Sequence, residues 1–109
     1  MDNRRGHDRV KISFPVECSL PTARQYFYTV SKDLSQGGVK IFSDNFIPRG
    51  NNIKVNINLI DCVLSFNSKV AWCNKERVSD RYVTGLQFVD TNKTAEADLS
   101  RFLNRVCNA

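Results

Sequence analysis

Apolar and polar residues alternate along most of this chain, a pattern typical of β-strands that bury one face and expose the other. The alternation is longest over residues 10–20, where every second position is apolar. These apolar positions are Val10, Ile12, Phe14, Val16, Cys18 and Leu20. Pro15 has no N–H to donate to a ladder, so we expect this strand to lie at a sheet edge or to carry a bulge at Pro15.

Five further segments contain β-branched, aromatic or alternating apolar residues and predict strands. They cover residues 26–31, 39–42, 53–59, 64–72 and 82–89. Two polar segments, residues 33–38 and 48–51, are rich in turn-forming residues and predict connections between strands. The strand over residues 64–72 contains the single tryptophan, Trp72, which we assign to the core in preference to a platform on which a base could stack.

The C-terminal segment follows a helical repeat instead. Its apolar residues recur at spacings that place them on one stripe of a helix. They are Ala95, Leu99, Phe102, Leu103 and Val106. Thr94 precedes the stripe and is the expected N-cap. Six strands followed by one amphipathic helix predict a mainly β fold, a six-stranded antiparallel barrel with the helix over an open end or a face.

The chain length of 109 residues fits a single domain. No run of about 18 apolar residues occurs, which argues against a transmembrane helix. The polar N-terminal residues lack the apolar stretch of a signal peptide, so we expect a cytoplasmic protein. The net charge of +5 favours anionic partners such as nucleotides, nucleic acid or acidic lipid, but a slightly basic solvated surface explains it equally well.

The four cysteines and the one histidine give little support for a metal site. No two cysteines form a CxxC pair, whereas a structural zinc site usually shows closely spaced ligands, so we predict no metal. Cys18 and Cys73 lie in apolar runs, where a reduced cysteine packs as a small core residue. The sequence contains no nucleophile elbow, paired-histidine motif or P-loop, so neither an enzymatic activity nor a cofactor is predicted.

Two short polar motifs could bind a ligand. The first is RxxxR, formed by Arg5 and Arg9 directly before the first strand. Each guanidinium can donate paired hydrogen bonds to a phosphate or to guanine O6 and N7, and can stack on a base. A solvated basic tail, common at chain termini, is the alternative interpretation.

The second motif is DxSxxG, formed by Asp33, Ser35 and Gly38. The Asp33 carboxylate could accept the N1 and N2 hydrogens of guanine, and the Ser35 hydroxyl could donate to a phosphate. Gly38 would let the backbone approach a ligand closely. An ordinary strand connection explains the motif as well, because Asp favours an Asx-turn and Gly supplies positive φ.

In this order, and with the strands between them, the two motifs resemble those of the PilZ domain family. The resemblance covers residues 4–106 and extends to GGVKI at 37–41, VAW at 70–72 and GLQF at 85–88. It implies a six-stranded antiparallel barrel with a C-terminal helix that binds the bacterial second messenger cyclic di-GMP and passes the signal to other proteins. It also implies that Arg5 and Arg9 bind guanine and phosphate, and that Asp33, Ser35 and Gly38 line the opposite wall of the site.

We therefore predict a cyclic di-GMP receptor without enzymatic activity. Residues 1–9 would form a mobile basic arm, and residues 10–109 the barrel with its helix. Ligand binding would order the arm and change the surface offered to a protein effector. Arg4 occupies a position that, in this family, influences whether one ligand or an intercalated pair binds, so we expect two ligands per chain.

Two alternatives remain at this point. One is a small nucleic-acid-binding barrel that uses the basic surface and the aromatic residues Tyr26, Phe27 and Tyr28. The arginines are concentrated near the N-terminus rather than spread in a stripe, which counts against it. The other is a ligand-free PilZ-like adaptor, which the presence of both motifs disfavours.

Overall fold

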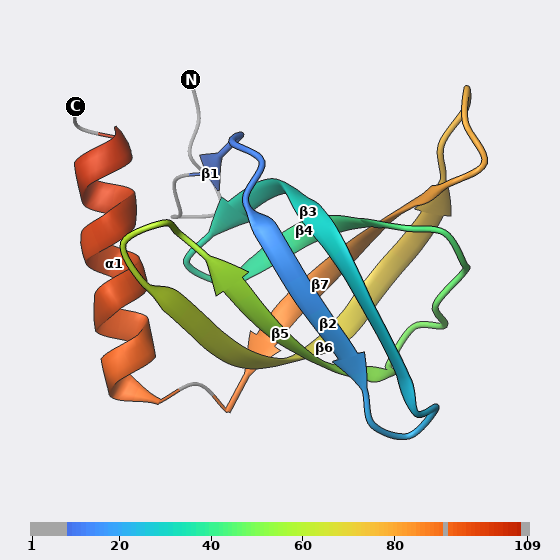
Figure 1. Cartoon of the computed structure of the whole chain (residues 1–109), viewed down its shortest axis with the longest axis horizontal. Coiled ribbons are helices and arrows are strands. Elements are labelled where there is room, and N and C mark those ends of the chain that lie inside the picture. Colours follow the sequence, from blue (N-terminus) through green and yellow to red (C-terminus); the bar gives the residue numbers. More distant parts are fainter. Residues whose placement is uncertain (1–8, 91, 108–109) are drawn as a thin grey trace.

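The computed structural model describes residues 9–90 and 92–107, which form seven strands and one helix (Figure 1). The strands are β1 (Arg9–Val10), β2 (Pro15–Leu20), β3 (Gln25–Ser35), β4 (Gly38–Ser43), β5 (Asn52–Asn58), β6 (Val63–Lys75) and β7 (Tyr82–Val89). The helix is α1 (Lys93–Cys107). Every β-strand pair is antiparallel, and β7 has the bounds expected from the sequence.

The strands close into a barrel. Their order in the sheet is β1-β3-β2-β5-β6-β7-β4, and an additional pairing of β3 with β4 joins the two ends. β1 and β2 both pair with β3 and take up consecutive parts of one β3 edge. Together they count as one interrupted strand, so the closed six-stranded antiparallel barrel expected from the alternating pattern is confirmed.

The interruption of the first strand corrects the prediction of one continuous strand over residues 10–20. Ser31, in the middle of β3, replaces the ladder there: its hydroxyl accepts from Phe14 N (2.9 Å) and donates to Ile12 O (2.9 Å). The Ser31 N–H donates to Phe14 O (2.9 Å). β2 begins at Pro15, directly after these hydrogen bonds of Ser31, and Pro15 lies opposite Val30. At this position the residue would not donate to β3, so the missing N–H of proline costs no ladder bond to β3.

The prediction of a turn over residues 33–38 was wrong in its bounds. β3 continues through Ser35 and β4 begins at Gly38, so the turn itself is only Gln36 and Gly37. The register of β3 against β4 shifts between Ser31 and Asp33, which is the position of a β-bulge. Asp33 and Ser35 are therefore strand residues.

The barrel interior is filled by the apolar residues of the alternating pattern. Fully buried members include Val16, Cys18, Leu34, Ile41, Ile53, Val55, Ile57 and Val70. The buried position of Cys18 was expected, and burial raises the pKa of its thiol to about 12, so the thiol stays protonated at neutral pH.

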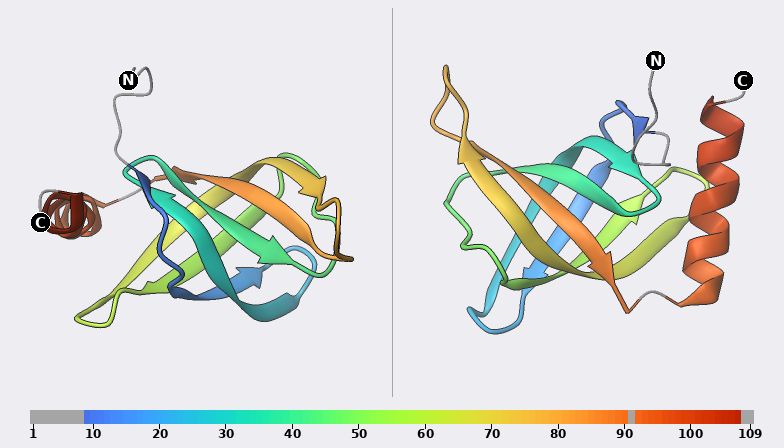
Figure 2. Two further views of the ribbon diagram at one scale, coloured as in Figure 1. Left: turned by 90° about the horizontal axis from the view of Figure 1, so that it is seen from above. Right: turned by 180° about the vertical axis from the view of Figure 1, so that it is seen from behind.

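Helix α1 covers one end of the barrel, and the β6–β7 hairpin projects from the opposite end (Figures 1 and 2). The predicted apolar stripe is confirmed as the packing face, with Leu99 fully buried and Phe102 in edge contact with Phe14 at 5.3 Å between ring centroids. The prediction that Thr94 is the N-cap was wrong. Asn92 caps the helix, because its Oδ1 accepts from Ala95 N (2.7 Å).

Candidate functional site

The two sequence motifs meet on the sheet. Arg9, the second arginine of RxxxR, lies in β1 opposite Ser35, the serine of DxSxxG. Ser35 in turn lies opposite Gly38 in β4. The barrel thus brings together, on three adjacent strands, three of the residues predicted from the sequence. Arg4 and Arg5 lie outside the described residues.

Asp33 and Ser35 belong to the outer face of the barrel. Leu34 between them is fully buried in the core, and successive strand residues point to opposite faces. Both are nevertheless little exposed, Asp33 at 5% and Ser35 at 2%. The Ser35 hydroxyl donates to Gly38 O across the turn at 3.4 Å, a long hydrogen bond that a better acceptor can replace.

Gly38 has a packing role within the barrel. A Cβ on Gly38 would lie 2.1 Å from the backbone oxygen of Leu86 in β7. The glycine therefore allows β4 and β7 to lie close together, where Gly38 pairs with Gln87. The close approach of backbone to a ligand that the sequence suggests for Gly38 is a separate role and stays a prediction.

The side chain of Lys40 in β4 contacts both Asp33 in β3 and Trp72 in β6. Lys40 lies opposite Asp33, and its Nζ is 3.2 Å from Asp33 Oδ2. The same ammonium lies 5.8 Å from the centroid of the Trp72 ring in β6. A carboxylate, an ammonium and an indole thus follow one another across the outer face.

The assignment of Trp72 to the core was wrong. Its side chain is only partly buried and does not belong to the buried apolar cluster. A register shift between Val70 and Trp72 brings Trp72 opposite Gly85, and a Cβ on Gly85 would meet the indole at 2.4 Å. The glycine in β7 therefore provides the space in which the indole lies flat on the outer face.

Comparisons with known proteins identify the family of this chain. A family model described as the PilZ domain matches residues 3–105. The chain belongs to the PilZ domain family. No curated protein sequence matches it.

Solved structures similar to this PilZ domain include three with low sequence identity. The inhibitor of motility MotI/DgrA of Bacillus subtilis is 16% identical with a TM-score of 0.84, over 98% of this chain and 52% of that one. The PilZ domain of YcgR from Escherichia coli, with c-di-GMP, is 17% identical with a TM-score of 0.78, over 97% and 93%. MrkH of K. pneumonia in its apo state is 14% identical with a TM-score of 0.81, over 99% and 52%. These similarities show a shared fold, and the chain spans about half the length of MotI/DgrA and MrkH.

Sequence reasoning did not connect Lys40 to this face of the PilZ domain. The residue lies in the segment GGVKI that contributed to the resemblance, but the pattern alone gave it no role. Lys40 lies between Val39 and Ile41, which are buried, so the alternation of the strand could have assigned the Lys40 side chain to the outer face. Its neighbour across the sheet could not be read from the sequence.

The turn of the DxSxxG motif also contacts the helix. Gln36 Nε2 donates to the backbone oxygen of Glu96 in the first turns of α1 at 3.3 Å. The outer-face site and the helix N-terminal region are therefore connected by the Gln36 side chain.

Among the residues that the structure describes, no group of three or more His, Cys, Asp or Glu side chains could hold a metal ion. No helix in that part of the chain is long and apolar enough to cross a bilayer.

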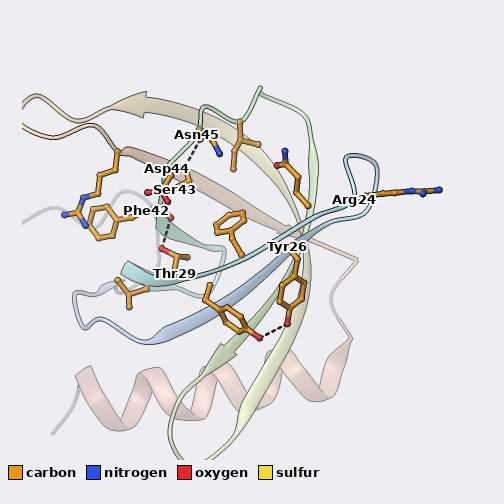
Figure 3. Close-up of a pocket in the computed structure, with 13 residues that line it drawn as sticks. Arg24, Tyr26, Thr29, Phe42, Ser43, Asp44 and Asn45 are labelled. Atoms are coloured by element: carbon orange, nitrogen blue, oxygen red, sulfur yellow. Dashed lines mark hydrogen bonds between the residues drawn. The ribbon is translucent and has the colours of Figure 1, made fainter.

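One cavity of the barrel lies away from this site. It has a volume of about 790 Å³ and lies between the N-terminal half of β3 and the residues around the end of β4 (Figure 3). Asp33, Ser35 and Gly38, the predicted site residues whose side-chain surroundings the structure describes, do not line it. The predicted site lies instead on the outer face, where Asp33 and Ser35 are little exposed.

Proposed function

We propose that this PilZ domain is a cyclic di-GMP receptor without enzymatic activity, in which ligand binding orders the N-terminal arm that precedes β1 (Arg9–Val10) and signals to a protein effector. The observation that carries the proposal is the pairing of Arg9 with Ser35, which joins the two motifs on neighbouring strands. The c-di-GMP complex of the YcgR PilZ domain, which has the same fold, supports the choice of ligand.

Each residue of the two motifs has a distinct chemical role in this proposal. Asp33 accepts the N1 and N2 hydrogens of a guanine base, and Ser35 donates to a phosphate oxygen. The guanidinium groups of Arg5 and Arg9 donate to phosphate or to guanine O6 and N7, and stack on the bases. Gly38 keeps β4 against β7 so that the outer face stays flat beside Asp33.

In this proposal, ligand binding begins with a change in the ion pair between Asp33 and Lys40. The Asp33 carboxylate lies in an ion pair with Lys40, so a guanine that bonds to Asp33 shares or replaces this partner. The displaced ammonium lies beside the position of the ligand and is attracted to its phosphates. Trp72, next to Lys40, adds an aromatic surface on which a base can stack.

The free-energy cost of ordering the arm can be compared with the gain from its hydrogen bonds to the ligand. Ordering the N-terminal residues costs roughly 1–2 kcal/mol per residue. Hydrogen bonds to charged groups contribute roughly 1.5–3 kcal/mol each. Four such bonds, two each from Arg5 and Arg9, would contribute roughly 6–12 kcal/mol, which offsets the ordering of about five residues of the arm.

Isothermal titration calorimetry with cyclic di-GMP and cyclic di-AMP tests the proposal. Asp33→Ala should weaken binding of the guanine ligand by roughly 5- to 150-fold and affect the adenine ligand less, because adenine lacks the N1 and N2 hydrogen pair. Arg5→Ala and Arg9→Ala should weaken both ligands. The matched control is Asp44→Ala, an exposed carboxylate just after β4 that should leave affinity unchanged. Absence of heat at high micromolar ligand would refute the receptor function and favour a ligand-free adaptor.

Amide hydrogen exchange and stoichiometry test the arm. Exchange of residues 4–8, which precede β1, should slow when cyclic di-GMP is added. Protection of the same amides without ligand would contradict the ordering step. The extra guanidinium of Arg4 leads us to expect two ligands per chain, and one after Arg4→Leu. A ratio of one in the unmodified protein would refute the ligand pair but not the receptor function.

A further inference from the structure

The barrel has an open seam between β3 and β4. β3 pairs with β4 only from Ser31 to Ser35, whereas its N-terminal half, from Gln25 to Val30, pairs with β2 alone. The cavity of about 790 Å³ occupies this seam, and residues of both strands line it (Figure 3). This volume lies within the range of ligand-binding clefts.

Backbone groups of β3 point into the seam. The Ser31 N–H donates to Phe14 O, so Ser31 directs its backbone groups away from β4. Backbone groups of successive strand residues alternate between the two edges, so Thr29 and Phe27 bond to β2 while Tyr28 and Tyr26 face the seam. Across the described chain, no backbone hydrogen bond outside the ladders involves Tyr26 or Tyr28, and neither residue pairs with β4.

One side-chain bond holds the narrow end of the seam. Thr29 Oγ1 donates to Phe42 O at 2.7 Å, in place of a ladder bond between the two strands (Figure 3). Beyond this bond, toward Gln25, the two walls separate and enclose the cavity. A free strand edge of two residues therefore borders a cleft that starts at Thr29.

The walls of the seam combine apolar, aromatic and charged groups, with Arg24 at one end of the lining and Asp44 and Arg81 on the β4 side. Phe27 and Ile47 are packed against the core and provide an apolar lining. Tyr26 and Tyr28 are 56% and 73% exposed and form an aromatic rim. Arg24 follows in the β2–β3 turn, at the end of the same strand edge. A complementary occupant has apolar side chains at alternate positions and a carboxylate that reaches Arg24.

We propose that an extended segment of a partner protein, with alternating apolar residues and an acidic residue at one end, adds as a β-strand to the free edge of β3. Its main chain bonds to the N–H and C=O groups of Tyr26 and Tyr28. Its apolar side chains enter the cavity over Phe27 and Ile47, and its acidic residue pairs with Arg24. The inference does not rest on the proposed function, because the edge of β3 is open without any ligand at Asp33.

Selection from a phage library of random peptides against the full chain identifies a probe. Enriched peptides should contain alternating apolar residues and an acidic residue, and a synthetic copy should shift the amide resonances of Tyr26 and Tyr28. Absence of enrichment over a bare support, or peptides that shift only resonances elsewhere, would overturn the proposal. An Arg24→Ala variant should bind the synthetic peptide less tightly, and an unchanged affinity would refute the acidic contact.

A pair of substitutions at one position isolates the main-chain bond. Tyr28→Pro removes the N–H that faces the seam, at a strand edge where proline is tolerated, and should weaken the peptide about tenfold. Tyr28→Ala removes the ring but keeps the N–H, and is the matched control, with a smaller expected loss. Equal affinities of the two variants would refute strand addition.

Two further measurements complete the test. A peptide N-methylated at the residues that face β3 should lose binding to the unmodified protein, which decides the question if Tyr28→Pro does not fold. Asp33→Ala should bind the peptide like the unmodified protein, so failure of the cyclic di-GMP site and failure of the seam are separate results. If the unmodified chain dimerises and Tyr28→Pro abolishes the dimer, a second copy of the chain occupies the seam, and the proposed partner is overturned.

Discussion

Substitution of Gly38 by alanine tests the close approach of β4 and β7. The added Cβ would lie 2.1 Å from Leu86 O, a distance that must open to at least 3.0 Å, so the strands must separate by about 0.9 Å (3.0 minus 2.1). The obstacle is backbone and cannot rotate away. Insertion of a methyl group into so tight a contact should lower the free energy of unfolding by about 1–3 kcal/mol.

Urea unfolding followed by Trp72 fluorescence measures this loss, because Trp72 is the single tryptophan and lies over the neighbouring Gly85. The corresponding fall in melting temperature is about 4–8 °C for each kcal/mol in a domain of this size. Gln87→Ala, at the exposed position opposite Gly38, is the control and should change stability by less than about 0.5 kcal/mol. Equal unfolding midpoints for Gly38→Ala and the unmodified protein would refute the argument, and Gly38 would then be free to serve a ligand alone.

Three further predictions concern the barrel and its helix. Ser31→Ala should cost about 1–3 kcal/mol in urea unfolding, because it removes one buried and one partly buried hydrogen bond to the interrupted strand, and Ser13→Ala, at an exposed position beside Phe14, should cost almost nothing. Asn92→Ala should lower stability by about 0.5–2 kcal/mol and reduce helical circular dichroism, and an unchanged protein would contradict its capping role. Iodoacetamide should modify exposed Cys62 well before Cys18, as followed by mass spectrometry. The folded-state pKa of Cys18 is raised from 9.0 to about 12, so stability should fall as pH rises between these values, and less so in Cys18→Ala.

The alternating pattern was sufficient to predict the barrel and the faces of most strands. β7 and the apolar stripe of α1 agree with the structure, because the burial of these residues follows a local repeat of two or of three to four positions. The two motifs were also recognisable in the sequence, since residue type and spacing define them. Their meeting through Arg9 and Ser35 was implied only by the resemblance to a family.

Tertiary structure decided the features that depend on which strands are neighbours. The break before Pro15 arises because Ser31, on another strand, bonds to the backbone of Phe14, and a local repeat carries no information about such a partner. The contacts of Lys40 with Asp33 and Trp72 depend on the register of β4 between β3 and β7 and on the shift that displaces Trp72. Periodicity fixes the face on which a side chain lies, but the neighbour across the sheet is set by pairing between distant segments, which is a property of the closed barrel.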